Sequence, residues 1–366
     1  MDFIPLASPD IQAADIHLVN EVLKSGMLVQ GRYVEKLEHS FSEVVQVPES
    51  IAVSNGTASL HLPLRLLGIG PGDEVIVPAF SYVATANVVE LVGAKPVFVD
   101  IDLGTYNIDV SKIREAITVK TKAIIPVHEF GLACDIEAVM QLAIEYDLYV
   151  IEDAACALGA TQHGRQVGSF GDFGSFSLHP RKSITSGEGG VVTTHNSLYA
   201  QRVRRLRNHG IDMVEGKMVF EEAGFNYRLT DIQGALAYSQ LSRLSAILEK
   251  KQRLAEIYLN GIKNRSFALP IVPSDRNHTW QTFHILIDDG RKQADVLNYL
   301  REHNIGANYG AQCIPAQKYY INKYDMDYKL LYPNAYAAFT QGIALPLYEK
   351  LNDDTIQYIA KIINSL

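Results

Sequence analysis

One lysine in a glycine-rich turn has the surroundings that most favour covalent chemistry. Lys182 lies in the tract SLHPRKSITSGEGG, residues 177–190, which follows a short apolar stretch. A lysine amine is a Schiff-base nucleophile when its surroundings lower its pKa, and neighbouring glycines let the backbone approach a bulky ligand. Ser177 adds a hydroxyl at the start of the tract. A lysine beside glycines is also an ordinary solvated turn, so the tract alone leaves both interpretations open.

Two carboxylates follow the apolar run at residues 149–151. They are Glu152 and Asp153. Acidic residues at the carboxyl end of a buried parallel strand face the crevice in which open α/β sheets bind ligands. A carboxylate there can pair with the protonated ring nitrogen of a cofactor. The alternative is an aspartate that only caps a helix or forms a salt bridge.

A third segment has the pattern of an anion site. The apolar run at residues 51–53 leads through Gly56 and Thr57 into a helical pattern. Free N–H groups and the helix dipole at such a start favour phosphate, although ordinary N-capping by Ser, Asn or Thr explains the same residues. Tyr82 follows another predicted strand. Its ring could stack on a flat cofactor or simply belong to the core.

The order of these features along the chain is more specific than any one of them. Phosphate cradle, aromatic residue, strand-end aspartate and lysine follow one another along alternating strands and helices. In this order, and in its lysine tract and the segment GFNYR at 224–228, the sequence resembles the DegT/StrS family of sugar aminotransferases. The resemblance runs from residue 23 to residue 347. It implies fold type I of the enzymes that depend on pyridoxal 5′-phosphate.

The resemblance also implies roles for individual residues. Lys182 forms the Schiff base with the cofactor, and Asp153 keeps the ring nitrogen protonated. Gly56, Thr57 and Ser177 hold the phosphate, and Tyr82 stacks on the ring. Two further cofactor-binding residues are implied, Cys156 and Asn226.

Cys156 and Asn226 differ in what they imply. Cys156 stands where many family members have Gln or His near the ring hydroxyl, and a thiol is a weaker hydrogen-bond partner. Asn226 is expected to reach the phosphate of a neighbouring subunit. The expected assembly is therefore a homodimer with shared active sites.

The implied reaction is amino transfer to a nucleotide-linked keto-deoxysugar, at its 4-keto position, from a donor such as glutamate. Such a step belongs to polysaccharide or O-antigen biosynthesis. Two alternatives stay open: a related sugar dehydratase or aminohydroxybenzoate-type synthase, and a non-catalytic regulator that binds the cofactor. Dehydratase relatives tend to replace the lysine with His or to add an iron–sulfur site, whereas Lys182 is present here.

The predicted fold is α/β, with a large, mostly parallel sheet that has helices on both faces. Strands are expected at 51–53, 74–77, 96–100, 123–127, 148–151, 174–177 and 190–194, and one of the last two is expected to be antiparallel. One long helix is predicted over 231–262, and Pro63 is expected to kink or shorten the helix after Gly56. Residues 1–250 form the predicted large domain, and 251–366 a smaller C-terminal α/β domain.

Composition excludes several other classes. The 366 residues carry a formal net charge of −8, which disfavours nucleic acid or an acidic membrane as partner. Three scattered cysteines indicate neither a disulfide framework nor a zinc or iron–sulfur site. The run HEFGL at 128–132 begins like a zinc-protease helix but lacks the second histidine.

Without a visible signal peptide or bilayer-spanning segment, the protein is expected to be cytoplasmic. The arginines at 202–207 are read as a solvated helix face or, alternatively, an anion or subunit contact.

Overall fold

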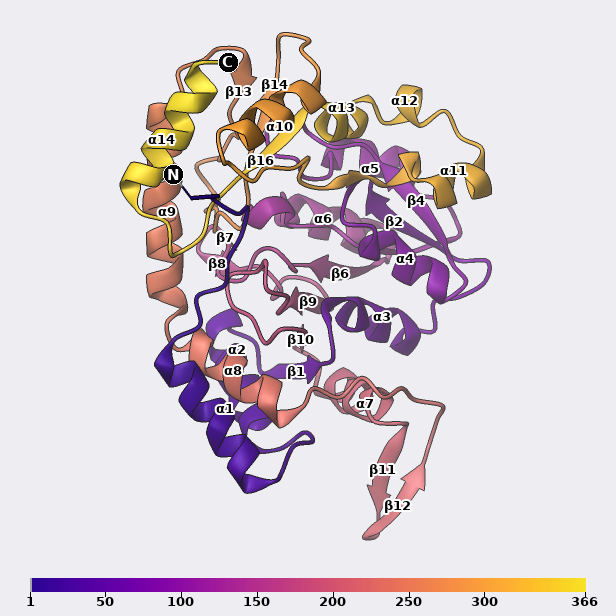
Figure 1. Cartoon of the computed structure of the whole chain (residues 1–366). Coiled ribbons are helices and arrows are strands. Elements are labelled where there is room, and N and C mark those ends of the chain that lie inside the picture. The colour runs from indigo at the N-terminus through magenta and orange to yellow at the C-terminus, as the bar shows by residue number, and fades with distance from the viewer. Residues whose placement is uncertain (1) are drawn as a thin grey trace.

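The large part of the molecule is built on one seven-stranded sheet (Figure 1). The structure is a computed structural model that describes residues 2–366. The strands lie in the order β1 (Glu49–Val53), β10 (Gly190–Thr194), β9 (Phe173–Ser177), β6 (Tyr149–Asp153), β5 (Thr121–Ile124), β2 (Glu74–Pro78) and β4 (Lys95–Val99). β10 runs antiparallel to both its neighbours, and the remaining neighbours are parallel. The predicted α/β class and the one antiparallel strand at the lysine turn are confirmed.

Helices cover both faces of this sheet because its strands are apolar on both sides. One face packs against α3 (Gly56–Leu66), α4 (Ala84–Leu91) and α7 (Ser197–Arg207). The other packs against α2 (Arg32–Val45), α5 (Val110–Ala116), α6 (Ile136–Tyr146) and α8 (Asp231–Leu241). α1 (Ala13–Ser25) lies against α8. The sheet is thus fixed between two layers, so its strand ends form a rigid edge.

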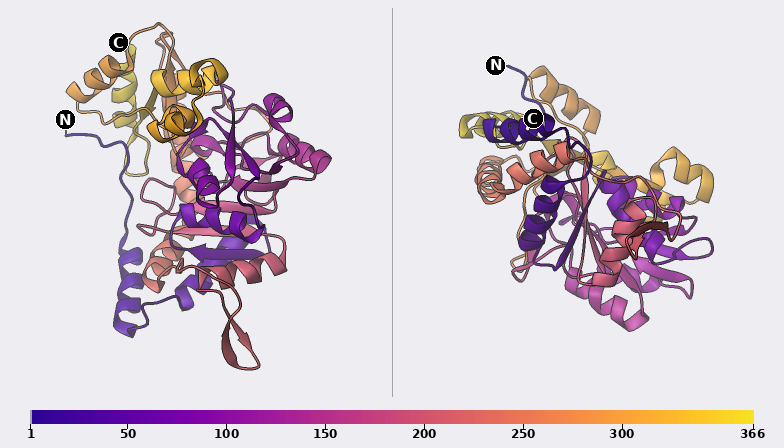
Figure 2. Two further views of the ribbon diagram at one scale, coloured as in Figure 1. Left: turned by 90° about the vertical axis from the view of Figure 1, so that its right-hand side faces the viewer. Right: turned by 90° about the horizontal axis from the view of Figure 1, so that it is seen from below.

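A smaller sheet carries the C-terminal part of the chain. It has the order β13 (Phe267–Ala268), β14 (Phe283–Ile287) and β16 (Gly342–Leu345), all antiparallel. Its core includes residues of α9 (Leu244–Gly261), α10 (Gln293–Glu302) and α14 (Asp353–Asn364). Ile4 forms a parallel bridge with Ile305, so both ends of the chain lie at this part of the molecule (Figures 1 and 2). The division after residue 250 falls inside α9 and stays a prediction.

The remaining elements are short. They are β3 (Phe80–Ser81) paired with β15 (Gln312–Cys313), β7 (Thr161–Gln162) with β8 (Arg165–Gln166), and β11 (Ile211–Val214) with β12 (Lys217–Phe220), together with α11 (Lys318–Tyr324), α12 (Tyr328–Leu331), α13 (Pro333–Gln341) and the 3₁₀ turns Glu129–Gly131 and Ile314–Ala316. The β11–β12 hairpin stands away from the body of the molecule in Figure 1 and in the left view of Figure 2. No helix in the described part of the chain combines the length and apolar character that a membrane crossing needs.

One helix prediction was wrong, and of the two effects predicted for Pro63, a kink or a shortened helix, the shortening does not occur. The predicted single helix over 231–262 is two helices, α8 and α9, separated at Ser242 and Arg243. Arg243 leaves the helical pattern, and its side chain binds Asp10 and Asp15 of the N-terminal segment. α3 continues through Pro63 to Leu66 and is not shortened there. Residues 58–64 of α3 are all buried, and this packing offsets the hydrogen bond that proline removes.

The arginines of α7 do not form a solvated face. Arg202 pairs with Glu222, Arg204 with Glu49, and Arg205 with Asp212. Arg207 is buried and binds both Glu38 and the carbonyl of Ala52. These arginines are tied to acidic side chains of the same chain, so they hold α7 and its flanking segments against the sheet.

Candidate active site

The lysine turn links the two strands at the antiparallel step of the large sheet. Leu178 donates to the carbonyl of Gly189 at 2.9 Å and accepts from Ser186 at 3.0 Å, which closes the turn on itself. Lys182 sits within the turn, where its backbone N–H donates to His179 at 2.8 Å. Its amine Nζ donates to the Sγ of Cys156 at 3.0 Å. Two residues predicted separately for the site, Lys182 and Cys156, are therefore in direct contact.

Acidic groups surround the lysine amine. Burial alone would lower the pKa of Lys182, but the thiol of Cys156 and the carboxyl of Asp153, together with Glu129, outweigh burial and raise that pKa. The raised value differs from the lowered pKa that lysine nucleophiles require. The acidic groups around Lys182 therefore favour its protonated amine, which the Cys156 sulfur holds through the 3.0 Å hydrogen bond.

The two carboxylates at the end of β6 point to opposite faces of the sheet and differ in role. Glu152 accepts hydrogen bonds from the N–H groups of Gly168, Phe170 and Gly171, and from Nε2 of His128 at 3.0 Å. All its acceptor positions are used inside the protein, so Glu152 is structural. The predicted acidic pair therefore separates into one structural and one available carboxylate.

Asp153 is the available one. It is 4% exposed and accepts from the Thr85 hydroxyl at 2.8 Å and from the Ala155 N–H at 3.2 Å. Burial raises the pKa of Asp153, and these two hydrogen bonds oppose that rise. A cationic ring nitrogen beside this carboxylate would restore its ordinary ionisation, because an opposite charge favours the ionised form.

The predicted phosphate cradle is formed by two strands and a helix start. Asn55 caps α3 through the N–H of Ala58 at 2.8 Å, which leaves the N–H groups of Gly56 and Thr57 without partners inside the helix. Capping and anion binding, treated above as alternatives, thus use different N–H groups. A Cβ on Gly56 would lie 2.9 Å from the Cβ of Ser177. Only glycine lets the helix start approach Ser177 this closely.

Within the described residues, the side chains of Tyr82 and Asn226 make no hydrogen bond to the residues above. Tyr82 is 66% exposed at the start of α4. Asn226 is exposed, while its neighbour Tyr227 accepts at its carbonyl from the N–H of Ser54 at 2.8 Å. The backbone of the Asn226 segment therefore runs beside the cradle of its own chain. Ring stacking by Tyr82 and a phosphate contact by Asn226 stay predictions.

The sequence did not reveal Ser81, Thr85 or Glu129 as part of this site. Thr85 binds Asp153, and its hydroxyl lies 3.4 Å from that of Ser81. Ser81 is in β3, which pairs with β15 of the C-terminal part, so Gln312 lies opposite it. Small hydroxyl residues after a strand are common, and only the segment SYVAT following a predicted strand offered a signal for them.

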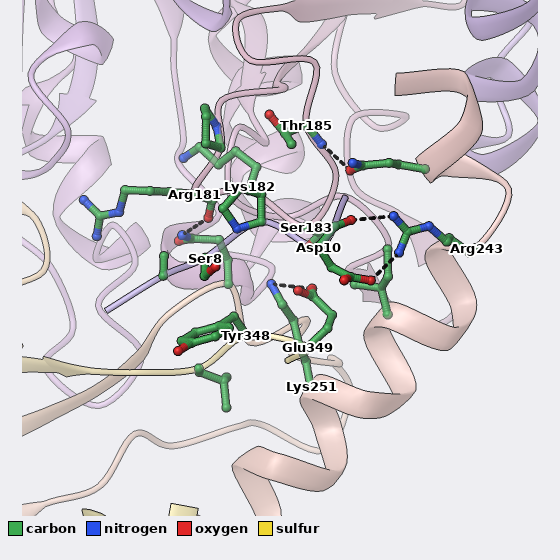
Figure 3. A pocket seen from close by; sticks show the side chains of 17 residues that line it. Ser8, Asp10, Arg181, Lys182, Ser183, Thr185, Arg243, Lys251, Tyr348 and Glu349 are labelled. Carbon is green, nitrogen blue, oxygen red and sulfur yellow. Dashed lines mark hydrogen bonds and ion pairs between the residues drawn. The ribbon is translucent and has the colours of Figure 1, made fainter. Parts of the chain in front are cut away.

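A pocket on the other side of the lysine turn is closed by the two ends of the chain (Figure 3). Lys251 of α9 is buried and faces Glu349 at 3.8 Å, and Arg243 binds Asp10 at 2.9 Å. Burial lowers the pKa of Lys251, although Glu349 opposes this. These ion pairs join the N-terminal segment and the chain after β16 to the start and middle of α9.

Comparison with known proteins identifies the family. The model of the DegT/DnrJ/EryC1/StrS aminotransferase family matches residues 9–364. The chain belongs to this family. It is 35% identical over 365 residues to the GDP-perosamine synthase of Escherichia coli O157:H7, covering 100% of this chain and 98% of that protein. It is also 35% identical over 382 residues to the UDP-4-amino-4-deoxy-L-arabinose–oxoglutarate aminotransferase of Shewanella sediminis, with 100% and 98% covered.

Solved structures agree with this assignment. The PLP form of the putative sugar aminotransferase Spr1654 from Streptococcus pneumoniae superposes with a TM-score of 0.93 at 30% identity, covering 99% of this chain and 98% of that one. The protein is thus a sugar aminotransferase with the fold type I architecture, and its cofactor is pyridoxal phosphate. The residues present fit that group, because the N–H groups of Gly56 and Thr57 at the start of α3 lie close to Ser177, and Asp153 has an available carboxylate.

Proposed function

We propose that this aminotransferase transfers the amino group of glutamate to the 4-keto group of a nucleotide-linked deoxysugar. The observation that carries the proposal is the contact of the Lys182 amine with Cys156 beside the buried Asp153, within a chain of this family. The names of two relatives at 35% identity include a GDP sugar and a UDP-4-amino sugar. Because those nucleotides differ, we leave the nucleotide open.

The roles of the side chains follow from their positions. Bound pyridoxal phosphate supplies an electron sink for the pair left when a proton leaves the amine-bearing carbon. Lys182 takes that proton on Nζ and later gives it back to a carbon atom. It would therefore act first as the general base and then as the general acid. Asp153 holds a negative charge opposite the ring nitrogen. Gly56, Thr57 and Ser177 bind the phosphate, and Tyr82 covers the ring.

We infer the amino donor from the keto acid that the name of one relative includes. One relative is named for oxoglutarate as well as for its amino sugar. Glutamate and 2-oxoglutarate differ by the exchange of an amino group for a keto oxygen, so glutamate fits as the donor. The amino acid leaves as the keto acid, and the sugar ketone becomes an amine.

The test is to load the protein with pyridoxamine phosphate and add a panel of nucleotide-linked 3-keto and 4-keto sugars. A 4-keto sugar is expected to restore the visible absorbance of the lysine-bound cofactor and to gain an amino group by mass. Reaction of only 3-keto sugars would contradict the proposed position. Loss of water from the sugar without amine gain would instead identify the dehydratase alternative.

We further propose a homodimer in which Asn226 reaches the partner's cofactor. Asn226 is exposed, which fits a contact outside its own chain. Mixing Lys182→Ala and Asn226→Ala proteins tests this, because one site of a mixed dimer then collects both changes and the other neither. Activity should recover to about a quarter of wild type at equal mixing. No recovery despite proven subunit exchange would place Asn226 in its own subunit's site or outside it.

A further inference from the structure

A third carboxyl group lies buried at the active site with no assigned role. Glu129 follows β5 and is 4% exposed. Its Oε2 has no hydrogen-bond partner among the described residues. The backbone around it is fixed, because its N–H donates to Asn107 Oδ1 at 2.8 Å and Phe130 adopts a left-handed φ of 55°. A buried, unpartnered carboxyl oxygen held this firmly indicates a missing hydrogen-bond partner.

The surroundings of Glu129 are those of the cofactor site. Its carboxyl is coupled electrostatically to Lys182 and Asp153, and the nearby Ser81 favours its ionised form. Cys156 is coupled to it as well. Beyond Ser81, the hydroxyl of Thr85 leads to Asp153, so polar groups continue from Glu129 to the ring-nitrogen carboxylate.

Burial favours the neutral form of the Glu129 carboxyl. Burial raises the pKa of its carboxyl to about 8, the attraction of Lys182 opposes this rise, and the charge of Asp153 adds to it. The charge of His128, whose Nε2 contacts Glu152 at 3.0 Å, favours ionisation of Asp153. A neutral carboxylic acid has a proton to donate, whereas a carboxylate only accepts.

The other edges of the cofactor already have partners in this site. Asp153 serves the ring nitrogen, and Gly56, Thr57 and Ser177 serve the phosphate. The edge with the phenolic oxygen lies next to the carbon that Lys182 binds, and there Cys156 offers only a weak donor. The charge of Glu129 acts on both Lys182 and Cys156, which are themselves in contact at 3.0 Å, so its carboxyl lies near this side of the site.

We infer that Glu129, in its neutral form, donates a hydrogen bond to the phenolic oxygen of the bound cofactor and takes over the role in which Cys156 is weak. The inference rests on the proposed role of Lys182 as the cofactor-bound lysine. Glu129 then stabilises the phenolate that forms when the proton shared with the lysine nitrogen leaves. Removing this donor makes the shared proton harder to lose.

The test is a pH titration of the visible absorbance of the wild-type holoenzyme and of Glu129→Leu and Glu129→Gln. Glu129→Leu loses a hydrogen bond to a charged oxygen. The pH at the midpoint of its absorbance change should therefore rise by about one unit. Glu129→Gln keeps a donor and the shape of the side chain, so its midpoint should stay close to wild type. The matched control is Glu74→Gln, which changes a buried carboxyl at the start of β2. It should not shift the midpoint of the pH titration.

Each possible result of this titration either supports or overturns the inference. An unchanged midpoint in Glu129→Leu overturns the inference. A lower midpoint in Glu129→Gln also overturns it, because it would show that Glu129 is a carboxylate paired with the protonated lysine nitrogen. Lys182→Ala separates this from failure of the proposed function: if that variant keeps the pH-dependent band of wild type, the role of Lys182 is wrong, and the inference fails with it. Circular dichroism confirms the fold of each variant.

Discussion

Asp153→Asn and Glu152→Gln are neighbouring, equally small changes for which we expect opposite effects. In Asp153→Asn the amide oxygen can still accept from Thr85, so the fold keeps the 2.8 Å hydrogen bond. What is lost is the charge opposite the ring nitrogen, together with the longer 3.2 Å hydrogen bond from the Ala155 N–H. A charge-assisted hydrogen bond contributes about 1.5–3 kcal/mol, which corresponds to a rate about 10- to 150-fold lower.

Glu152→Gln should instead destabilise the fold. In the wild-type protein each carboxyl oxygen of Glu152 accepts from two donors. In the variant one of these oxygens is replaced by an NH₂ group, which cannot accept. Two hydrogen bonds are lost in a fully buried place, at a cost of about 2–4 kcal/mol. The rate at cofactor saturation should stay close to wild type, because no oxygen of Glu152 faces Lys182 or Asp153.

The assay pairs two measurements on each variant. Single-turnover conversion of the cofactor by glutamate, at saturating cofactor, gives the rate, and thermal unfolding gives the stability. The reasoning predicts a slow, stable Asp153→Asn and a fast, less stable Glu152→Gln. A wild-type rate in Asp153→Asn, or a rate loss of tenfold or more in Glu152→Gln with no loss of stability, would refute the assignment of the two carboxylates.

Two further predictions concern the cradle and α7. Gly56→Ala should weaken cofactor binding by about tenfold or more, measured by equilibrium dialysis, because its Cβ would lie 2.9 Å from that of Ser177; unchanged affinity would contradict the cradle. Arg207→Met should cost about 3–5 kcal/mol in urea unfolding, because the 14%-exposed side chain of Glu38 loses its cationic partner and the buried carbonyl of Ala52 loses a donor. The matched change Arg202→Met, at a side chain 43% exposed, should cost less than about 1 kcal/mol, and equal losses would contradict this account.

The sequence was sufficient for features that depend on local pattern. The strands of the large sheet have short apolar runs, and the residues directly after them become neighbours because parallel strands end at one edge. Asp153 and the cradle at Gly56 were candidates on that basis, with capping or a salt bridge as the alternative, and the family resemblance added their roles. The Lys182 turn was recognised from its glycines and from the family resemblance.

Features set by distant contacts could not be predicted. The break between α8 and α9 has no glycine or proline, and it depends on Arg243 reaching Asp10 across the chain. Glu129 lies in a run that resembles part of a metal-site motif, and its role depends on burial against Ser81 and Lys182. Hydrophobic periodicity has no information about such contacts.

The central claim is that Lys182 is the residue that binds the cofactor covalently. Borohydride reduction of the holoenzyme followed by peptide mapping tests it most directly. We predict the reduced adduct on the peptide that contains Lys182, and no adduct in Lys182→Ala, which should remain folded. An adduct on another lysine, Lys251 in the adjoining pocket included, would contradict the account.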